Sequence, residues 1–209
     1  NDFGRAGEPI SNLELLDWLA TEFVKSEWSI KHMHRVIMNT KVYRRSSNPN
    51  VQNADKDPGN VHHWRMNLRR LEAETIRDRI LQISGQLNHK RGGPSFYPAL
   101  NGEVVAGASK PGRGWRWSNE EDQKRKSVYA FVKRTMVYPF FELFDYANTE
   151  GSLGTRPQTT VAPQALLMLN SELITESASL ISKRALSSKD PIGKAFRIIL
   201  GRDPATAER

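Results

Sequence analysis

Apolar residues recur along most of this chain at intervals of three and four, which is the spacing of a helix that buries one face. The clearest series lies in the middle of the chain and consists of Ala73, Ile76, Ile80, Ile83 and Leu87. This series predicts a helix. Gly92 to Pro94 should end the region, because glycine and proline interrupt helices.

Two helices are predicted near the start of the chain. Ser11 and Glu14 form a Ser-x-x-Glu capping box, so we expect a first helix from about Asn12 to Lys25. Ser29 is a typical helix cap, and a second helix should follow it and fade near Thr40. The residues expected to face inward from these helices are Leu16, Leu19, Phe23, Val24, Ile30, Met33, Ile37 and Met38.

The last third of the chain is also predicted to be helical. The expected helices run from Pro163 to Asn170, from Glu172 to about Leu186 and from Pro191 to Leu200. Asp190 should cap the third of these helices, and Gly201 should stop it. The spacing of Leu166, Leu169 and Leu173 predicts a buried face.

The remaining segments have the composition of loops. Residues 48–60 contain Asn, Asp, Pro and Gly and almost nothing apolar, and residues 94–119 and 139–154 are expected to be irregular. In residues 127–133, small or apolar residues alternate with aromatic ones, a pattern that suits a short strand. A helix beginning near Glu120 is the alternative, because acidic residues favour a first helical turn.

The predicted fold class is therefore mainly α, with six or seven helices around a single core, two long irregular loops and little or no β structure. We expect residues 1–209 to be one domain, or most of one, truncated at both ends. Its parts would be a helical region at 11–90, an irregular aromatic and basic segment at 94–157, and a helical region at 160–209.

Both ends of the sequence suggest a piece of a longer protein. The chain begins with Asn1 and shows no basic stretch followed by an apolar one, so no signal peptide is visible. Near its end, Asp203 and Pro204 have the pattern of a helix start, and the sequence ends about a turn and a half later.

Composition narrows the possible chemistry. The chain has no cysteine, which excludes disulfides, thiol catalysis, cysteine-type zinc sites and covalent haem attachment within this piece. No apolar run reaches the roughly 20 residues of a membrane span. The net charge of +8 favours contact with an anionic surface, nucleic acid or polysaccharide.

The histidines offer the clearest candidates for acid–base chemistry. His32 and His34 lie two residues apart on a predicted helix and point in nearly opposite directions, so they cannot bind one metal together. A catalytic site would combine one of them with Asp78 or Asp145. The alternative is that one histidine packs and the other is solvated. No histidine spacing predicts a metal site.

A second candidate site combines basic and aromatic residues. Residues 110–134 contain eight basic and three acidic side chains, with aromatic residues interleaved. Such a segment could stack on bases or sugar rings, or Trp115 and Trp117 could instead anchor a loop to the core. The candidate ligand-binding residues are Trp115, Arg116, Trp117, Arg125, Tyr129, Lys133, Arg134 and Arg156.

A third group of charged residues lies on the middle helix and just before it. Its members are Arg69, Arg70, Glu72, Glu74, Arg77 and Asp78. Each carboxylate has an arginine within a helical turn, which favours ion pairing over catalysis. Alternatively, Arg65, Arg69 and Arg77 could line an anion site with Arg156 if the helices converge.

Several motifs together resemble one protein family. They are Asp2-Phe3-Gly4, Glu14 to Ala20, Ser29 to His32, Trp64-Arg65, Arg70 to Glu74, Arg77-Asp78, Ser127 with Tyr129, Lys133-Arg134, Phe144-Asp145 and Thr160 to Ala165. The chain resembles the planctomycete-type secreted domain of unknown function, which is usually C-terminal to a cytochrome c-like haem domain in large extracytoplasmic proteins. The resemblance implies a periplasmic or secreted location and a haem elsewhere in the parent protein, and it brings no catalytic residue.

The sequence thus predicts a non-catalytic extracytoplasmic module that binds a partner domain of the parent protein or an anionic polysaccharide, without a cofactor of its own. The alternative is a hydrolase acting on acidic or sulfated glycans through a His/Asp site. Nucleic acid is an unlikely partner for an extracytoplasmic chain.

Overall fold

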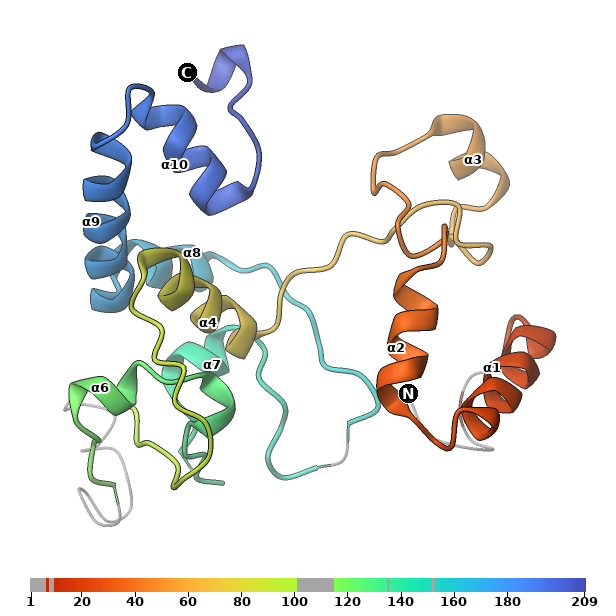
Figure 1. Cartoon of the computed structure of the whole chain (residues 1–209), viewed down its shortest axis with the longest axis horizontal. Coiled ribbons are helices and arrows are strands. Elements are labelled where there is room, and N and C mark those ends of the chain that lie inside the picture. The colour runs from red at the N-terminus through yellow and green to blue at the C-terminus, as the bar shows by residue number, and fades with distance from the viewer. Residues whose placement is uncertain (1–6, 8–9, 101–114, 135, 152) are drawn as a thin grey trace. The chain divides into compact units, whose positions relative to one another are not determined.

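The computed structural model describes residues 7, 10–100, 115–134, 136–151 and 153–209 (Figure 1). The backbone divides into two compact units, Asn1–Arg70 and Leu71–Arg209, and each is described separately below. The Asp2-Phe3-Gly4 motif and residues 101–114 of the expected irregular segment lie outside the described residues.

Two capped helices that pack together make up the first half of the first unit. Helix α1 spans Leu13–Lys25 and helix α2 spans Ile30–Met38. The Oγ of Ser29 accepts from the backbone N–H of His32 at 3.3 Å, as expected of a cap. The cap of α1 is Asn12 rather than Ser11, since the Asn12 Oδ1 accepts from the N–H of Leu15 at 2.9 Å.

The segment 48–60, expected to be a loop, contains a short helix, α3 (Val51–Lys56). The Oδ1 of Asn50 accepts from the N–H of Asn53 and caps this helix. Beyond it, the carboxylate of Asp57 accepts from two backbone N–H groups of the next turn, and the N–H of His62 is the main reason that the Asp57 pKa lies below its ordinary value.

The first unit has little interior. No apolar side chain in its described residues is buried, and its one buried residue is Asn60. The leucines, isoleucines and methionines expected to face inward from α1 and α2 are at least partly exposed. The contact between α1 and α2 therefore buries none of the apolar residues that were expected to face inward.

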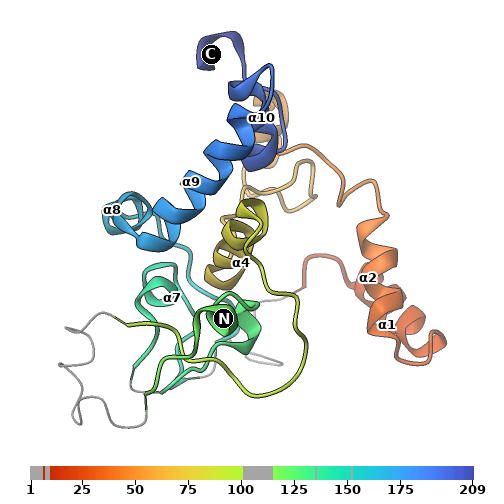
Figure 2. The same ribbon diagram turned by 60° about the vertical axis from the view of Figure 1, so that its left-hand side comes forward.

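The second unit holds the remaining elements, which Figures 1 and 2 show in olive yellow for α4 and in green to blue for the others. They are α4 (Ala73–Ser84), α6 (Glu120–Gln123), the 3-10 helix η2 (Ser127–Tyr129), α7 (Pro139–Leu143), α8 (Ala162–Asn170), α9 (Glu172–Leu186), α10 (Pro191–Leu200) and the 3-10 helix η3 (Thr206–Glu208). Helix α4 packs against α7, η2 and α9, and α9 also packs against α8 and α10. Helix α4 therefore belongs with the C-terminal helices, although the sequence-based division grouped it with the N-terminal ones.

The apolar core of the second unit is largely aromatic. Its buried members are Ala73, Phe96, Ala130, Phe140, Phe141 and Phe144. The last three come from α7 and the residue after it, in a segment that was expected to be irregular. Pro139 occupies the first turn of α7, where the missing proline N–H costs no hydrogen bond.

The mainly α fold class is confirmed. The described residues form nine α-helices and no sheet, and their β structure consists of isolated bridges. Residues 127–133 begin with the 3-10 turn η2 rather than forming a strand. No helix among the described residues combines the length and apolar character that crossing a bilayer requires.

The C-terminal helices begin and end close to the expected residues. Helix α10 is capped by the Asp190 Oδ1, which accepts from the N–H of Gly193 at 3.0 Å, and it ends at Gly201 with φ of +72°. One expectation was wrong: Leu166 and Leu169 are exposed, and Leu167 and Met168 pack on the core instead. Where Asp203 and Pro204 predicted a further helix, the structure has the single 3-10 turn η3.

Candidate functional site

Of the two tryptophans in the predicted ligand-binding segment, only one is exposed. Trp115 is 8% exposed, and its indole Nε1–H donates to the Pro98 carbonyl oxygen at 3.0 Å. Its ring packs edge-on against Tyr97 and Phe131. Trp115 therefore anchors its segment to the unit, as in the alternative interpretation, while Trp117 is 57% exposed.

Arg125 is also part of the interior. It is 2% exposed, donates to the carbonyl oxygens of Pro94 and Gly92, and lies over the ring of Tyr129 at 4.2 Å. The Tyr129 hydroxyl accepts from the N–H of Gly92 at 2.9 Å. These contacts hold the glycine-rich segment at 92–94 in place and leave neither side chain free for a ligand.

The other cations of the predicted site lie in different surroundings. Arg156 pairs with Glu74 at 2.7 Å and Glu72 at 3.5 Å, and the hydrogen bond that it donates to Glu74 is the main reason that the Arg156 pKa is raised. Arg134 lies 3.8 Å from the carboxylate of Glu150. The remaining two are Arg116, which is exposed, and Lys133, which is half-buried.

Arg77 does not contribute to the alternative anion site on the middle helix. Arg77 is buried and donates to the carbonyl oxygens of Arg125 and Gln123 and to the Ser127 Oγ, and burial lowers its pKa. The neighbouring Asp78 accepts from the N–H and the Oγ of Ser127 at 2.7 and 2.6 Å. Both side chains thus tie α4 to η2.

Three of the four catalytic candidates have polar contacts within their own units. His32 lies 2.9 Å from the Glu22 carboxylate at the surface of the first unit, and His34 is exposed. Asp78 and Asp145 belong to the second unit, where Asp145 accepts from the N–H and Oγ of Thr159. The described residues contain no group of three or more His, Asp or Glu side chains that could hold a metal ion.

The polar residue of the Thr160 to Ala165 motif has a structural contact as well. Gln164 is buried, and its amide donates to the Leu143 carbonyl oxygen at 2.9 Å and to the Thr159 hydroxyl at 3.2 Å. Its carbonyl oxygen accepts from the N–H of Val161. Gln164 therefore connects α8 to the end of α7.

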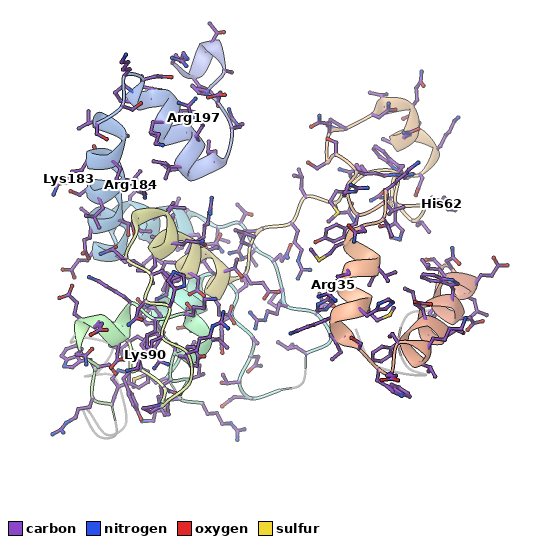
Figure 3. All side chains as sticks on the ribbon, viewed as in Figure 1. Arg35, His62, Lys90, Lys183, Arg184 and Arg197 are labelled. Carbon is purple, nitrogen blue, oxygen red and sulfur yellow. The ribbon has the colours of Figure 1, made fainter. Side chains whose placement is uncertain are left out.

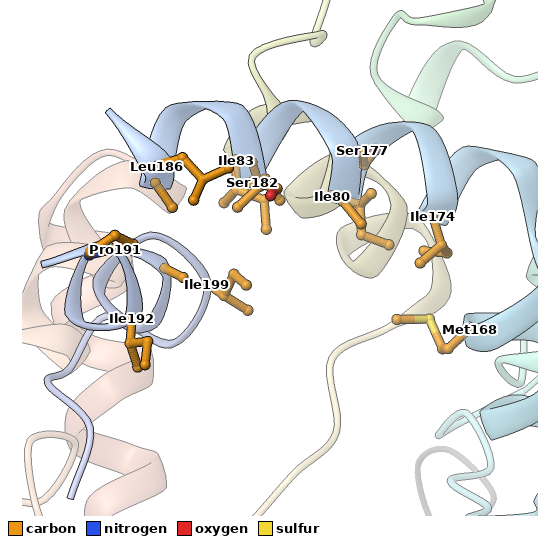
Figure 4. Close-up of a pocket in the computed structure, with 14 residues that line it drawn as sticks. Ile80, Ile83, Met168, Ile174, Ser177, Ser182, Leu186, Pro191, Ile192 and Ile199 are labelled. Carbon is orange, nitrogen blue, oxygen red and sulfur yellow. The ribbon is translucent and has the colours of Figure 1, made fainter. Parts of the chain in front are cut away.

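The second unit has a cavity of about 460 Å³ between α4, α8, α9 and α10 (Figure 4). We call it the aliphatic groove. Side chains from the first three helices that line it include Ile80, Ile83, Met168, Ile174, Ile181 and Leu186. From α10 come Pro191, Ile192, Ala195 and Ile199. Among the described residues that line it, only Ser177 and Ser182 are polar, and none carries an ionisable side chain.

Local sequence explains the shape of the groove. Helices α9 and α10 are joined by a short turn that ends at the Asp190 cap, and the two helices pack against each other. A side-chain Cβ at Gly193 would lie 2.1 Å from the Asp190 Oδ2, so this cap requires glycine at that position.

Two arginines are fixed at the edge of the aliphatic groove. The Arg184 Nη1 donates to the carbonyl oxygen of Ile83 at 2.6 Å, and the Arg79 Nη2 donates to that of Ile198 at 3.5 Å. Figure 3 shows Arg184 and Lys183 on the same turn of α9. Each acceptor lies in the last turn of its helix, where carbonyl groups lack intrahelical partners.

Sequence reasoning did not find the groove. Its signals are the series Ile192, Ala195 and Ile199 in α10 and the series Ile174, Ile181 and Ala185 in α9. Both series have helical spacing and predict buried faces. What the sequence does not reveal is that four such faces meet around an open space.

The whole chain matches one family model. Residues 1–209 match PSD1, described as a protein of unknown function (DUF1553), so the chain belongs to this family. No curated protein and no solved structure matches the chain.

Proposed function

We propose that this member of the DUF1553 family is a non-catalytic interaction module, and that its aliphatic groove binds a helical segment of a protein partner. The groove itself is the observation that supports this proposal. It is about 460 Å³ in volume and lined almost entirely by aliphatic side chains of four helices. Laying the apolar face of a helix into an apolar groove is a recurrent mode of peptide recognition.

The lining of the groove favours binding over catalysis. Acid–base catalysis requires a titratable group within hydrogen-bond reach of the reacting atom, and the groove lining offers only two serine hydroxyls. Outside the groove, the carboxylates of Asp78 and Asp145 already accept hydrogen bonds that hold their own segments together. The hydrolase alternative therefore gains no support.

A protein partner is also favoured over a polysaccharide. Sugar recognition uses an exposed aromatic face together with several hydrogen-bonding groups. Trp115 and Arg125, two central members of the predicted sugar site, are buried, and the aliphatic groove has no aromatic lining residue. Burial of apolar surface is instead the main driving force of protein association.

The setting of the module is the second part of the proposal. We place it outside the cytoplasm, in a planctomycete-type parent protein whose cytochrome c-like haem domain is a candidate partner. The support is the family resemblance carried by motifs such as Arg70 to Glu74 and Thr160 to Ala165. Immunodetection of the parent protein in periplasmic and cytoplasmic fractions tests the location, and recovery in the cytoplasm alone would contradict it.

The binding proposal is tested by selecting from a displayed library of amphipathic helical peptides with the purified chain. The selected peptides are then measured against two variants of α9. Ser182→Trp places a large ring in the groove from an exposed lining position. Ser179→Trp makes the same change at an exposed position of the same helix that does not line the groove.

We expect the selected peptides to bind the wild-type chain and Ser179→Trp equally well and to bind Ser182→Trp at least about tenfold more weakly, a difference of about 1.4 kcal/mol. Circular dichroism and melting temperature establish that both variants fold. Enrichment of no peptide, or equal binding to both variants, would overturn the proposal.

A further inference from the structure

The edge of the aliphatic groove carries positive charge that the protein does not neutralise. Arg79 and Arg184 are exposed, and each donates to a backbone carbonyl oxygen. Within the described part of the chain, neither guanidinium has a carboxylate within ion-pair distance. Because carbonyl oxygens carry no net charge, both side chains remain full cations.

Nearby carboxylates pair with other cations. Asp190 pairs with Arg209 at 3.0 Å, Asp203 with Arg197 at 2.6 Å, and Glu208 with Arg202 at 2.7 Å. These are the three acidic side chains of residues 183–209, which contain seven basic ones and thus carry a net charge of +4. The excess charge therefore lies on cations without a carboxylate partner in this segment, and Arg184 is one of them.

A third exposed cation lies on α10, close in sequence to the lining residues of that helix. Lys194 is exposed on α10 and follows the lining residue Pro191 by three positions, so it lies on a neighbouring strip of the helix surface. Arg79 and Arg184 come from α4 and α9, whereas Lys194 comes from α10. An occupant of the groove would therefore meet cations that come from three of the four helices that line it.

The dimensions of the groove suit a helix. Along α9, lining residues extend from Ile174 to Leu186. Twelve residues of helix span about 18 Å, so a partner helix of about three turns fits alongside. At one end of this row the lining residue Leu186 is 70% exposed, so its side chain is accessible to a partner. Such an extended surface exceeds the needs of a small ligand.

We infer that the aliphatic groove binds an amphipathic helix whose apolar face is flanked by acidic side chains. This inference rests on the proposed function and specifies the chemistry of the partner. Aliphatic residues of the partner would fill the groove, while glutamate or aspartate residues on each side would meet Arg79, Arg184 and Lys194. The carbonyl contacts of the two arginines hold their guanidinium groups in place, which lowers the conformational cost of binding.

The test uses two synthetic peptides and the full chain. Both peptides are amphipathic helices of about 16 residues with leucines spaced to fill a groove. One carries glutamate on both sides of the leucine stripe and the other carries lysine. We expect the acidic peptide to bind at least about tenfold more tightly in low salt. The difference should shrink as ionic strength rises to about 0.3 M, because salt screens exposed charges.

Variants assign the effect to the edge of the groove. Lys194→Glu has no hydrogen bond or ion pair to disturb in the described structure and should weaken the acidic peptide about threefold to tenfold. Arg184→Gln retains a donor for the Ile83 carbonyl oxygen while removing the charge. Lys183→Glu is the matched control, because Lys183 is exposed on the same turn of α9 but, unlike Arg184, makes no hydrogen bond to α4 among the described residues.

The outcomes separate this inference from the proposed function. Binding of neither peptide would overturn both. Equal binding of both peptides, or tighter binding of the basic one, would overturn the acidic partner but leave the groove as a helix site. Two further outcomes would also overturn the inference: self-association of the chain that Ser182→Trp abolishes, and tighter binding of dodecanoate than of the acidic peptide.

Discussion

Arg125 brings a positive charge into the interior of the second unit and holds a glycine-rich segment there. Its guanidinium donates to the carbonyl oxygens of Pro94 and Gly92, and the plane of the group lies over Tyr129. A lysine could not reproduce this fork-shaped geometry, because its ammonium is a single point of contact. The charge therefore serves the fold rather than a ligand.

We predict that Arg125→Met lowers the free energy of unfolding by about 3 kcal/mol, because it removes a buried guanidinium together with its hydrogen bonds to two part-buried carbonyl oxygens. Arg116→Met removes the same charge at an exposed position and should change stability by less than about 0.5 kcal/mol. Urea denaturation measures both values. Similar losses in the two variants would show that net charge, rather than the buried contacts, is responsible.

Replacing Trp115 and replacing Trp117 by alanine should have very different effects on stability, although the two residues are only two positions apart. Trp115→Ala removes a buried ring and its hydrogen bond to Pro98, so it should cost about 3 to 5 kcal/mol. Trp117→Ala removes an exposed ring and should cost less than about 1 kcal/mol. The midpoints of chemical unfolding test this contrast, and an equal loss would contradict the anchoring role of Trp115.

At the scale of single elements, helix α10 depends on the ionisation of its cap. The N–H of Gly193, and next the side chain of Arg209, hold the Asp190 pKa below its ordinary value of 3.8. A carboxylate with a lowered pKa stabilises the fold above its unfolded pKa and loses that contribution as pH falls through the folded value. The start of α10 should therefore loosen in acid.

We predict faster amide exchange in the first turn of α10 as pH falls from about 6 to about 2, after correction for the intrinsic pH dependence of exchange. Asp190→Asn keeps an oxygen that can accept from the N–H of Gly193 but does not titrate, so its α10 should show no such acid transition. An identical acid response in the variant would show that another group controls the helix.

Helices with both a cap and a periodic face could be predicted from the sequence, and short helices could not. Ser29 and Asp190 marked the starts of α2 and α10 correctly. Helix α3 was not predicted because its sequence is mostly polar and none of its residues is buried. Helix α7 was not predicted because its buried residues Phe140 and Phe141 are consecutive and so do not show helical spacing. Tertiary contacts, rather than local pattern, determine such helices.

The candidate sites show the same limit. Aromatic and basic residues were adjacent in the sequence, but adjacency does not tell which side chains face inward, and Trp115 and Trp117 took opposite environments. The aliphatic groove requires contacts between α4 and α9, whose residues are about a hundred positions apart, as in the Arg184 bond to the Ile83 carbonyl oxygen. A single sequence does not reveal contacts at that separation.

At the scale of the whole molecule, the two units bury very different amounts of apolar surface. The second unit contains every buried apolar side chain among the described residues, whereas the first unit contains none. Burial of apolar surface supplies most of the free energy that opposes unfolding. The two units should therefore differ in local stability.

We predict that amides in α1 and α2 exchange with solvent at least about a hundredfold faster than those in α4 and α9, corresponding to a difference of about 3 kcal/mol in opening free energy. Hydrogen exchange of the intact chain, followed by mass spectrometry, measures this ratio. Equal protection in the two units would contradict the prediction and indicate that α1 and α2 are covered in solution.

The two interior arginines also allow protease digestion to report how long each molecule stays folded. A trypsin-like protease must draw an arginine or lysine side chain into its own specificity pocket, and most of the 31 such residues in this chain are available to it. Arg77 and Arg125 are withdrawn from the surface. The peptide bonds that follow these two residues should survive until the second unit opens, so their cleavage records how long each molecule has stayed folded.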